Sequence, residues 1–558
     1  MHKQLNCCTN LMDIFMQCEK DADDFTTEKN IVKGAKIDYG VQNQSIGQIL
    51  LDIFHKYGDY TGWTESESGR QMTYAQIKDK SIRLALWFQQ QGIGSGDVIT
   101  ICSSNCLNNY VVNYAILYVG AVYNPWHHEF TLESARYAFK LTRPKVMFVC
   151  SNMIDTIEKA AKLENLDVKI VTYEDFPNKE MIDDLIQASK EEDVDRFAVQ
   201  KIEDPSTQIA GLLFSSGTSG APKCVTMTYQ SLLNIILTNA KVVIRPNDVI
   251  LWYSVPYWIV STVYTLSTVF RKNKVIICEK SYDFERICQL IEEHKINTVI
   301  GHPNLLVNFS KHKFANRYKL GSLNRVFVSA SKLGQDTAEQ FRNDFPHISL
   351  YQGYGMTEHG LIFMQNERCK NSESVGHIVP NAWVKIVEIE TGQVLGFDEQ
   401  GEICCKSPML TPGYQNNPEA TAETIDKEGW LHTGDIGYRD KNGEFFIVDR
   451  IKSVIRYRFH HIYPSEITEH LLRHPDVLAV GVTSFPHEED VEHAIAFVQR
   501  VPGSKVTEDE LVEHSAKLGY YKKLWGGVKF LDALPRTASG KIATNTLKEM
   551  AKSHAQNY

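Results

Sequence analysis

The stretch Ser215–Lys223, which reads SSGTSGAPK, combines residue types that suit the binding of an anion. Its glycines let backbone N–H groups converge on a ligand without interference from Cβ atoms, and its hydroxyl side chains add hydrogen-bond donors. Lys223 adds a positive charge on a flexible stem. Together these groups predict a loop around a polyphosphate, most simply the β- and γ-phosphates of ATP. On composition alone, a solvent-exposed linker is an equal alternative.

The spacing inside this stretch differs from two common nucleotide-binding motifs. A P-loop reads GxxxxGK[ST], whereas here Pro222 occupies the fifth position after Gly217 and Cys224 follows the lysine. The GxGxxG spacing of dinucleotide-binding folds is not met either. The sequence therefore predicts a phosphate loop of another kind.

Four further segments carry side chains that could take part in a reaction of ATP. They are YQGYGMTEHG (Tyr351–Gly360), GWLHTGDIGYRD (Gly429–Asp440), IVDRIKSVIRYR (Ile447–Arg458) and LPRTASGKI (Leu534–Ile542). Their candidate side chains are Thr357, Glu358, Asp435, Arg450, Lys452 and Lys541. Any one segment is weak evidence, because an aspartate near glycines is more often a turn cap than a ligand. All five segments in this order form a specific pattern.

Short apolar, β-branched runs alternate with helical patterns through most of the chain before about Ala382. The runs are Val98–Cys102, Lys145–Cys150, Val168–Tyr173, Ala210–Phe214, Val249–Val255, Lys274–Cys278 and Asn297–Gly301. Between two of them, DFERICQLIEEHKI has apolar residues at helical spacing. This alternation is typical of parallel α/β layers, and it places the phosphate loop directly after a buried strand.

The residue composition changes after about Ala382, where glycine, proline and turn residues become frequent. This pattern predicts a β-rich subdomain. A length of 558 residues is too great for a single hydrophobic core. From Arg450 onward Lys and Arg slightly outnumber Asp and Glu, although the whole chain carries a net charge of −9. We therefore expect an N-terminal domain over residues 1–449 and a C-terminal domain over residues 450–558.

The composition narrows the class of protein. Hydrophobic residues make up 43% and charged residues 23%, as in an ordinary globular chain. The net charge of −9 argues against nucleic acid as a partner, because phosphate contacts need clustered Lys and Arg. The 12 cysteines are scattered without a CxxC pair, which favours reduced thiols over disulfides or a zinc site.

Neither a membrane span nor a targeting signal is evident. The longest uncharged run, Tyr253–Phe270, contains Pro256 and many hydroxyl side chains, so we expect buried interior and no transmembrane segment. The N-terminal residues lack the continuous apolar stretch of a secretory signal, and the final residues SHAQNY are not a Ser-Lys-Leu type of peroxisomal address. We expect a cytoplasmic location, with a peroxisomal one as the alternative.

The five segments resemble those of the adenylate-forming superfamily, which includes acyl- and aryl-CoA synthetases, 4-coumarate–CoA ligases, beetle luciferases and peptide-synthetase adenylation domains. The likeness extends from about Thr73, in MTYAQI, to Ile542, and WLHTGDIGYRDKNGEFFIVDRIKS is most similar to the luciferase and 4-coumarate–CoA ligase branch. The resemblance implies a large N-terminal α/β domain with a β-barrel-like subdomain and a small mobile C-terminal α+β lid. It also implies that a carboxylate attacks the α-phosphate of ATP, and that a thiol, usually coenzyme A, then displaces AMP.

The resemblance implies roles for the residues around the phosphates. The β- and γ-phosphates would be cradled by Ser215, Ser216, Gly217, Thr218, Ser219, Gly220 and Lys223. Thr357 would contact the α-phosphate, and Glu358 would hold Mg²⁺, a hard cation that suits carboxylate and phosphate oxygens. Lys541, on the lid, would bridge the oxygens of the carboxylate and the phosphate during adenylation.

Further implied roles concern the nucleoside, the acid and the second step. Asp435 would accept hydrogen bonds from both ribose hydroxyls, assisted by Arg450. The adenine and acyl sites would be lined by Gly353, Tyr354 and Gly355. Arg456 keeps a positive charge in the lid loop near the thiol path, and Asp449–Lys452 would be the hinge of the lid. The catalytic groups would therefore be Lys541, Thr357, Lys223 and Arg456.

Four positions depart from the pattern of the superfamily, and the first, Cys224 in place of a glycine after the loop lysine, is expected to be tolerated because the lysine is kept. Ile259, in VPYWIVS, stands where relatives carry a histidine that helps close the acyl site. Lys332, in SASKLG, replaces a proline of a turn in the pocket wall. Phe459, in the lid loop RYRFHHIYPSE, replaces a glycine, and its ring could narrow the thiol tunnel unless a small backbone shift keeps that tunnel open.

The histidine-rich segments do not predict a metal site. Adjacent histidines at 127–128 and 460–461 are expected to point apart, and no third ligand is apparent. The segment HEEDVEH (His487–His493) misses the HExxH spacing of zinc proteases.

The residues leave three hypotheses. The first is an ATP-dependent carboxylate–CoA ligase that uses ATP, Mg²⁺ and coenzyme A on a fatty or aromatic acid. The second is an adenylating enzyme that passes the acyl group elsewhere, to O₂ as a luciferase does or to another nucleophile. The third is a degenerate homologue that binds nucleotide or acyl ligand without turnover, and the retained Glu358, Asp435 and Lys541 speak against it.

Overall fold

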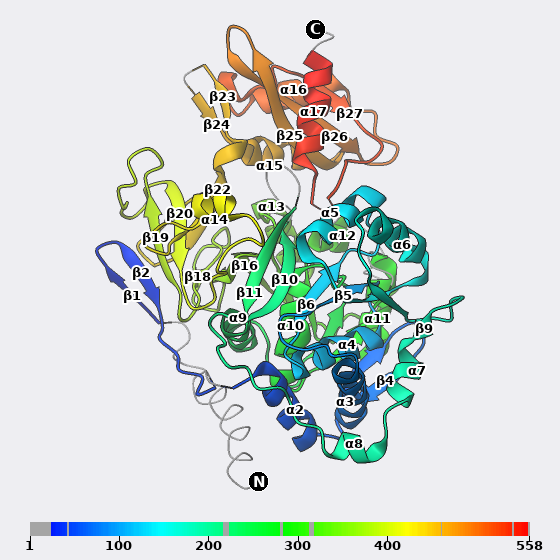
Figure 1. Cartoon of the computed structure of the whole chain (residues 1–558). Helices are drawn as coiled ribbons and strands as arrows, with labels where there is room; N and C mark the ends of the chain where they lie inside the picture. The colour runs from blue at the N-terminus through cyan, green and yellow to red at the C-terminus, as the bar shows by residue number, and fades with distance from the viewer. Residues whose placement is uncertain are drawn as a thin grey trace.

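The computed structural model describes residues 24–41, 44–215, 222–279, 283–311, 317–458, 460–537 and 541–555. Figure 1 shows a large N-terminal part built on three sheets and a smaller C-terminal domain above it. The expected fold class, an α/β N-terminal domain followed by a small α+β domain, is confirmed.

The first sheet has seven strands and is parallel except at one edge, where β10 and β11 form an antiparallel hairpin. Its strand order is β11-β10-β6-β5-β7-β8-β9. The strands are β5 (Val98–Cys102), β6 (Val122–Trp126), β7 (Val146–Val149), β8 (Lys169–Thr172), β9 (Glu180–Met181), β10 (Ile209–Ser215) and β11 (Lys223–Thr228).

The second sheet has nine strands, with a parallel centre and antiparallel strands at both edges. Its order is β18-β17-β16-β15-β14-β12-β13-β3-β4. The strands are β3 (Thr61–Glu65), β4 (Gln71–Thr73), β12 (Val249–Trp252), β13 (Lys274–Ile277), β14 (Thr298–Gly301), β15 (Arg325–Val328), β16 (Ser349–Met356), β17 (Gly360–Met364) and β18 (His377–Ile378). The parallel α/β layers predicted from the alternation of apolar runs and helical patterns are therefore confirmed.

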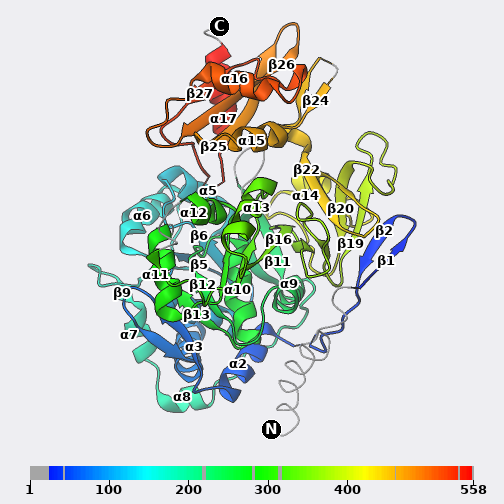
Figure 2. The ribbon, with the colours of Figure 1, turned by 180° about the vertical axis from the view of Figure 1, so that it is seen from behind.

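Helices cover these two sheets and fill the space between them (Figure 2). They are α2 (Ile46–Lys56), α3 (Tyr74–Gln90), α4 (Leu107–Tyr118), α5 (Leu132–Thr142), α6 (Ile154–Leu163), α7 (Ile182–Gln187), α8 (Glu191–Asp195), α9 (Tyr229–Val242), α10 (Ile259–Phe270), α11 (Phe284–His294), α12 (Asn304–Lys311) and α13 (Gln335–Asp344). Every residue of α4 is buried, and α10 buries most of the uncharged run ending at Phe270. Within the described ranges, no helix combines the length and apolar character needed to cross a bilayer.

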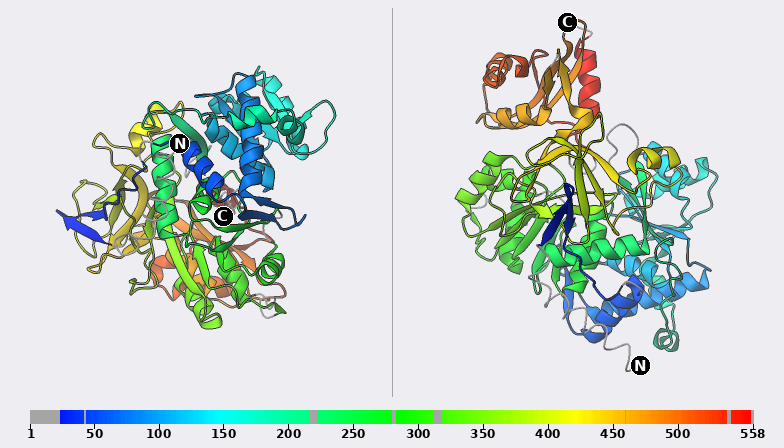
Figure 3. Two further views of the ribbon diagram at one scale, coloured as in Figure 1. Left: turned by 90° about the horizontal axis from the view of Figure 1, so that it is seen from below. Right: turned by 90° about the vertical axis from the view of Figure 1, so that its left-hand side faces the viewer.

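The third sheet is the expected β-rich subdomain, with six antiparallel strands in the order β1-β2-β19-β20-β21-β22. Its elements are β1 (Phe25–Glu28), β2 (Ile31–Gly34), β19 (Trp383–Val387), β20 (Gly401–Lys406), β21 (Leu431–Arg439), β22 (Phe445–Arg450) and the short helix α14 (Pro418–Thr424). Figure 3 (right) shows its yellow strands directly below the C-terminal domain, between green and cyan elements of the other sheets.

The C-terminal domain folds around a sheet of its own, ordered β24-β23-β26-β25, with β27 pairing to β26. Its elements are β23 (Ile455–Tyr457), β24 (His460–Ile462), α15 (Pro464–Leu472), β25 (Val477–His487), β26 (Val491–Arg500), α16 (Glu508–Ala516), β27 (Val528–Phe530) and α17 (Thr544–Ala555). Its apolar side chains form clusters separate from those of the N-terminal part, which is the property expected of an independent domain. The boundary at residue 450 stays a prediction.

Three-residue 3₁₀ helices complete the described structure: η2 (Ser151–Met153), η4 (Ile451–Ser453) and η5 (Tyr520–Lys522). The first follows β7 and leads into α6. The second links β22 to the C-terminal domain, where the sequence predicts a hinge over Asp449–Lys452.

Candidate active site

The β10–β11 hairpin frames the predicted phosphate loop. Ser215 ends β10 and pairs with Lys223, the first residue of β11, and the Ser215 hydroxyl donates to the Lys223 carbonyl at 3.5 Å. The predicted residues Ser216, Gly217, Thr218, Ser219 and Gly220 lie outside the described residues. The pairing of β10 with β11 therefore fixes the positions of Ser215 and Lys223, the two ends of the predicted loop.

The turn between β16 and β17 carries Thr357 and Glu358. The Glu358 side chain is buried, and its Oε1 accepts a hydrogen bond from the Tyr414 hydroxyl at 2.8 Å. Burial raises the pKa of Glu358, and the Tyr414 hydrogen bond and the charges of Lys223 and Arg450 oppose that rise. The Glu358 carboxyl group thus bonds to Tyr414 and interacts with the charges of Lys223 and Arg450.

Gly353, Tyr354 and Gly355 lie on β16, where it pairs with β17. A Cβ atom on Gly355 would lie 2.3 Å from the Gly360 carbonyl oxygen, so the hairpin closes at this point only without a side chain. A Cβ atom on Gly353 would lie 2.7 Å from the Phe327 ring. The two glycines thus let β17 and the Phe327 ring approach the backbone closely.

Asp435 and Arg450 face each other across β21 and β22, with Arg450 Nε 3.3 Å from Asp435 Oδ1. The Tyr354 hydroxyl donates to Asp435 Oδ2 at 2.5 Å, which ties the second sheet to the third. Burial raises the pKa of Asp435, while Arg450 and the Tyr354 hydrogen bond act in the opposite direction. Three of the predicted residues therefore form one polar group.

Lys541, from the segment before α17, is partly buried and lies near this group, since its charge interacts with those of Asp435 and Arg450. Burial and the positive charge of Arg450 lower the pKa of Lys541 to about 8, and the carboxyls of Asp435 and Glu358 oppose this shift. The C-terminal domain thus brings a cation to the two carboxyl groups of the N-terminal part. Of the predicted residues, the structure brings Glu358, Tyr354, Asp435, Arg450 and Lys541 together.

Arg456 lies elsewhere. It is exposed on β23, and its backbone N–H donates to Glu492 Oε2 at 2.7 Å within the C-terminal domain. Figures 1 and 2 show the β23–β24 hairpin above α15 and away from β16. Phe459, the departure noted in this hairpin, lies outside the described residues.

Sequence reasoning missed two polar groups beside the cluster. Tyr414 joins Glu358 as described, and the glycine, proline and turn residues around it predict only a β-rich subdomain. His302 follows β14, and its Nε2 lies 2.9 Å from the Ser331 hydroxyl oxygen. Burial and the positive charges of Lys541 and Arg536 lower the pKa of His302 to about 4. A histidine directly after a parallel strand was the available signal, because ligands bind at that end of such sheets.

The residues present suit Mg²⁺. Glu358 supplies a hard carboxylate oxygen in a buried position, and Mg²⁺ takes one or two such oxygens and completes its shell with phosphate and water. Two other groups of potential ligands in the described residues are Glu402–Cys404–His432, on β20 and β21, and His487–Asp490–His493, in the C-terminal domain.

The expectation that adjacent histidines point apart is wrong at His127 and His128. Their rings stack with centroids 4.9 Å apart and planes at 17°. Alternation of side chains requires an extended strand, and β6 ends at Trp126, one residue earlier.

The family to which the chain belongs follows from two domain matches. The AMP-binding enzyme model matches residues 54–415, and the AMP-binding enzyme C-terminal domain model matches residues 466–541. The chain belongs to the AMP-binding enzyme family. This confirms the adenylate-forming superfamily inferred from the five segments, and the chain is an adenylate-forming enzyme. Membership also supports ATP as its nucleotide.

Individual AMP-binding enzymes match over nearly the whole chain. Luciferin 4-monooxygenase from Nipponoluciola cruciata is 30% identical over 94% of this chain and 98% of that protein. 4-Coumarate–CoA ligase 2 from Nicotiana tabacum is 32% identical over 85% of this chain and 89% of that protein. ATP-bound MatB from Rhodopseudomonas palustris has a TM-score of 0.82 and 22% identity, and the match covers 91% of this chain and 99% of that one.

These comparisons give the fold and the reaction class. One of the two sequence relatives is named as a monooxygenase and the other as a CoA ligase, at similar identity. The acceptor of the acyl group is therefore a matter for proposal.

Proposed function

We propose that this AMP-binding enzyme is an ATP-dependent carboxylic acid–CoA ligase that acts on a fatty or aromatic acid. The observation that carries the proposal is the position of Lys541, a partly buried side chain that the C-terminal domain brings near enough to Asp435 and Glu358 for their charges to interact. A cation in this place suits a reaction in which a carboxylate must approach a triphosphate of the same charge.

In the first step, a carboxylate oxygen bonds to the α-phosphorus of ATP and the bond to pyrophosphate breaks. Lys541 orients the two anions and neutralises the charge between them. The stretch Ser215–Lys223 holds the β- and γ-phosphates, and Thr357 contacts the α-phosphate. Mg²⁺, when bound, offsets phosphate charge, and Glu358 is the residue that would hold it.

The nucleoside is placed by the group that joins the second and third sheets. Asp435 accepts from the ribose hydroxyls, and Arg450 opposes the rise that burial causes in the pKa of this carboxyl group. Gly353, Tyr354 and Gly355 line the adenine and acyl sites. Because both carboxylate oxygens of Asp435 already have a protein partner, its orientation is set before ATP binds.

In the second step, the thiol sulfur of coenzyme A bonds to the acyl carbon and the bond to AMP breaks. We assign Arg456 to this step, since it is exposed on β23 and distant from the adenylation cluster. The hinge at Asp449–Lys452 would turn the C-terminal domain between the two steps.

A second candidate is an adenylating enzyme whose acceptor is not coenzyme A. The match to luciferin 4-monooxygenase favours it, as does the replacement at Phe459, whereas the missing histidine at Ile259 speaks against O₂ as the acceptor. In such an enzyme, AMP release would not depend on coenzyme A.

The test is pyrophosphate release with a panel of short, long and aromatic acids, with and without coenzyme A. A ligase releases pyrophosphate only with its acid and accumulates an acyl-thioester. Pyrophosphate release at the same rate with and without coenzyme A, and with no acyl-thioester formed, supports the second candidate. No pyrophosphate release with any acid, while ATP still binds, would favour a non-catalytic homologue. Unchanged turnover in Lys541→Ala and Asp435→Ala would contradict the roles assigned to these residues.

A further inference from the structure

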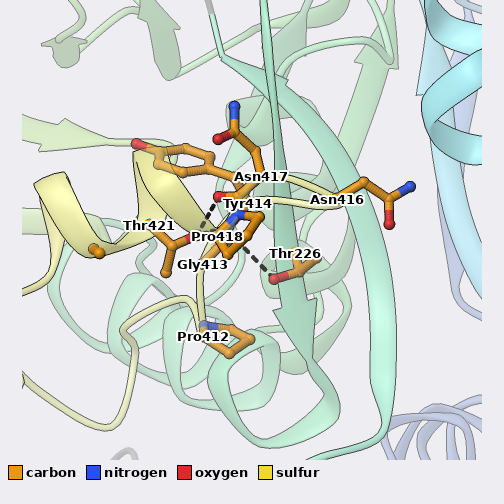
Figure 4. Close-up of a pocket in the computed structure, with 9 residues that line it drawn as sticks. Thr226, Pro412, Gly413, Tyr414, Asn416, Asn417, Pro418 and Thr421 are labelled. Carbon is orange, nitrogen blue, oxygen red and sulfur yellow. Dashed lines mark hydrogen bonds between the residues drawn. The ribbon is translucent and has the colours of Figure 1, made fainter.

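Tyr414 occupies a turn that is fixed from three sides. Its backbone forms a bridge with Val225 of β11, and its N–H donates to the Thr421 hydroxyl of α14 at 3.0 Å. On one side of it the Thr411 N–H donates to the Glu358 carbonyl at 2.8 Å, and on the other the Gln415 N–H donates to the Cys224 carbonyl at 2.8 Å. Figure 4 shows this turn beside a cavity of about 440 Å³ that Tyr414 helps to line.

The side chain of Tyr414 contacts two of the predicted site residues at once. Its hydroxyl donates to Glu358 Oε1 at 2.8 Å, and Lys223 Nζ lies 4.5 Å from the centre of its ring. Tyr414 and Glu358 are both buried, which strengthens each of these contacts relative to a solvent-exposed one.

The Tyr414 side chain contacts two groups of opposite charge, Lys223 at its ring and Glu358 at its hydroxyl. No ion pair joins Lys223 to Glu358 among the described residues, although the charge of Lys223 acts on the Glu358 carboxyl group. Without the ring, the ammonium and the carboxylate could form a direct pair, because opposite charges attract strongly in a buried site. In such a pair, Lys223 would be less available to a phosphate and Glu358 less available to a cation.

We propose that Tyr414 is a positioning residue for the phosphate end of ATP, in which the ring places Lys223 and the hydroxyl places Glu358. This inference rests on the proposed function, which assigns Lys223 to the phosphates and Glu358 to Mg²⁺. It adds a residue to which neither the motifs nor the resemblance gives a role.

The two contacts can be separated by substitution. Tyr414→Phe keeps the ring over which Lys223 lies and removes the bond to Glu358. Tyr414→Leu removes both. Tyr229→Phe is the matched control, because it also deletes a buried tyrosine hydroxyl, which donates to the Ala121 carbonyl at 3.0 Å on the far side of β11 from the turn.

The measurement is calorimetric titration of each full-length variant with ATP, in MgCl₂ and in EDTA, without any acid. Tyr414→Phe should bind ATP about tenfold more weakly in MgCl₂ and unchanged in EDTA, as expected for a lost hydrogen bond to a charged group. Tyr414→Leu should bind more weakly in both solutions, and Tyr229→Phe should match the wild type in both. A purely structural role would lower the affinity of Tyr414→Phe equally with and without Mg²⁺.

The outcomes separate this inference from the proposed function. Tyr414→Phe that binds Mg²⁺ and ATP like the wild type, or that loses affinity equally in both solutions, overturns the inference even if the wild type is an active ligase. A wild type that binds ATP in a Mg²⁺-dependent way but activates no acid contradicts the proposed function and leaves the Tyr414 result standing. A wild type that binds no ATP contradicts both.

Discussion

Lys541 is the single residue whose charge most directly controls the proposed first step. Its pKa is lowered to about 8 by burial and by Arg450, so the ammonium form prevails below that pH and is lost above it. The kcat/KM for ATP, measured by pyrophosphate release, should therefore fall as the pH rises through about 8, because this parameter reports the free enzyme.

Two substitutions test this assignment. Lys541→Arg should move the alkaline fall to much higher pH, since a guanidinium keeps its proton. Lys541→Ala should slow pyrophosphate release by about 10²–10³-fold at neutral pH. An alkaline limb that is the same in the wild type and in Lys541→Arg would assign the titration to another group.

Tyr354 is expected to matter through Asp435. Tyr354→Phe removes the 2.5 Å bond to a buried carboxyl group, which raises the pKa of Asp435 further and weakens its hold on the ribose. The KM for ATP should rise about tenfold, in line with a lost bond to a charged acceptor. Tyr114→Phe deletes another buried hydroxyl, which donates to the Thr265 carbonyl, and should leave this KM unchanged. Equal KM changes in the two variants would argue for a general packing effect.

At the scale of elements, the β16–β17 hairpin depends on Gly355. Gly355→Ala would drive its Cβ against the Gly360 carbonyl, a backbone atom that cannot turn aside. We expect a loss of about 1–3 kcal/mol in the free energy of unfolding and a displaced Thr357–Glu358 turn. Urea unfolding and pyrophosphate release measure the two effects. Gly321→Ala, where a Cβ meets nothing within 4 Å, is the control and should change neither.

A second element-scale feature is the contact between α13 and α15. Glu469 on α15 lies 3.6 Å from Lys332 Nζ and accepts from the Gln335 N–H at 3.2 Å, while Arg473 pairs with Asp336. These bonds join the C-terminal domain to the N-terminal part in the arrangement that brings Lys541 near Asp435 and Glu358. Lys332, one of the departures from the superfamily pattern, thus has a partner on the C-terminal domain.

These α13–α15 contacts should make the first step sensitive to salt. Partly exposed pairs contribute little each and are screened by ions, so pyrophosphate release should fall several-fold between low and high NaCl. Glu469→Gln should lower the rate at low salt and flatten the salt dependence. Glu549→Gln, which breaks an exposed pair with Lys552 inside α17, is the control. A salt dependence that persists unchanged in Glu469→Gln would contradict this role.

The sequence predicted elements well where a local pattern decides them. The run Val98–Cys102 is a strand over the predicted residues, because a short β-branched run is buried on both faces of a parallel sheet. The helical spacing of DFERICQLIEEHKI corresponds to α11, Phe284–His294. Tyr414 could not be found this way, since its contact with Glu358 joins residues 56 positions apart. The prediction that the side chains of His127 and His128 point apart is wrong, because β6 ends at Trp126, one residue before His127.

At the scale of the whole molecule, the C-terminal domain offers two surfaces to one site. Lys541 is partly buried and lies near Asp435 and Glu358 of the N-terminal part, whereas Arg456 on β23 is exposed and β23 lies above α15. One rigid domain cannot present both at once, so the two proposed half-reactions should require two positions of that domain. The hinge at Asp449–Lys452, where β22 passes into η4, is the connection that would allow the change.

This arrangement predicts opposite defects in two variants. Lys541→Ala should lose acid-dependent pyrophosphate release but still form thioester from added acyl-adenylate and coenzyme A, because the second step does not use the lysine. Arg456→Ala should retain pyrophosphate release and lose most thioester formation. Both half-reactions can be followed separately by pyrophosphate detection and by chromatography of the thioester. Loss of both steps in either variant would mean that the C-terminal domain serves them from a single position, since one surface would then carry the groups for both.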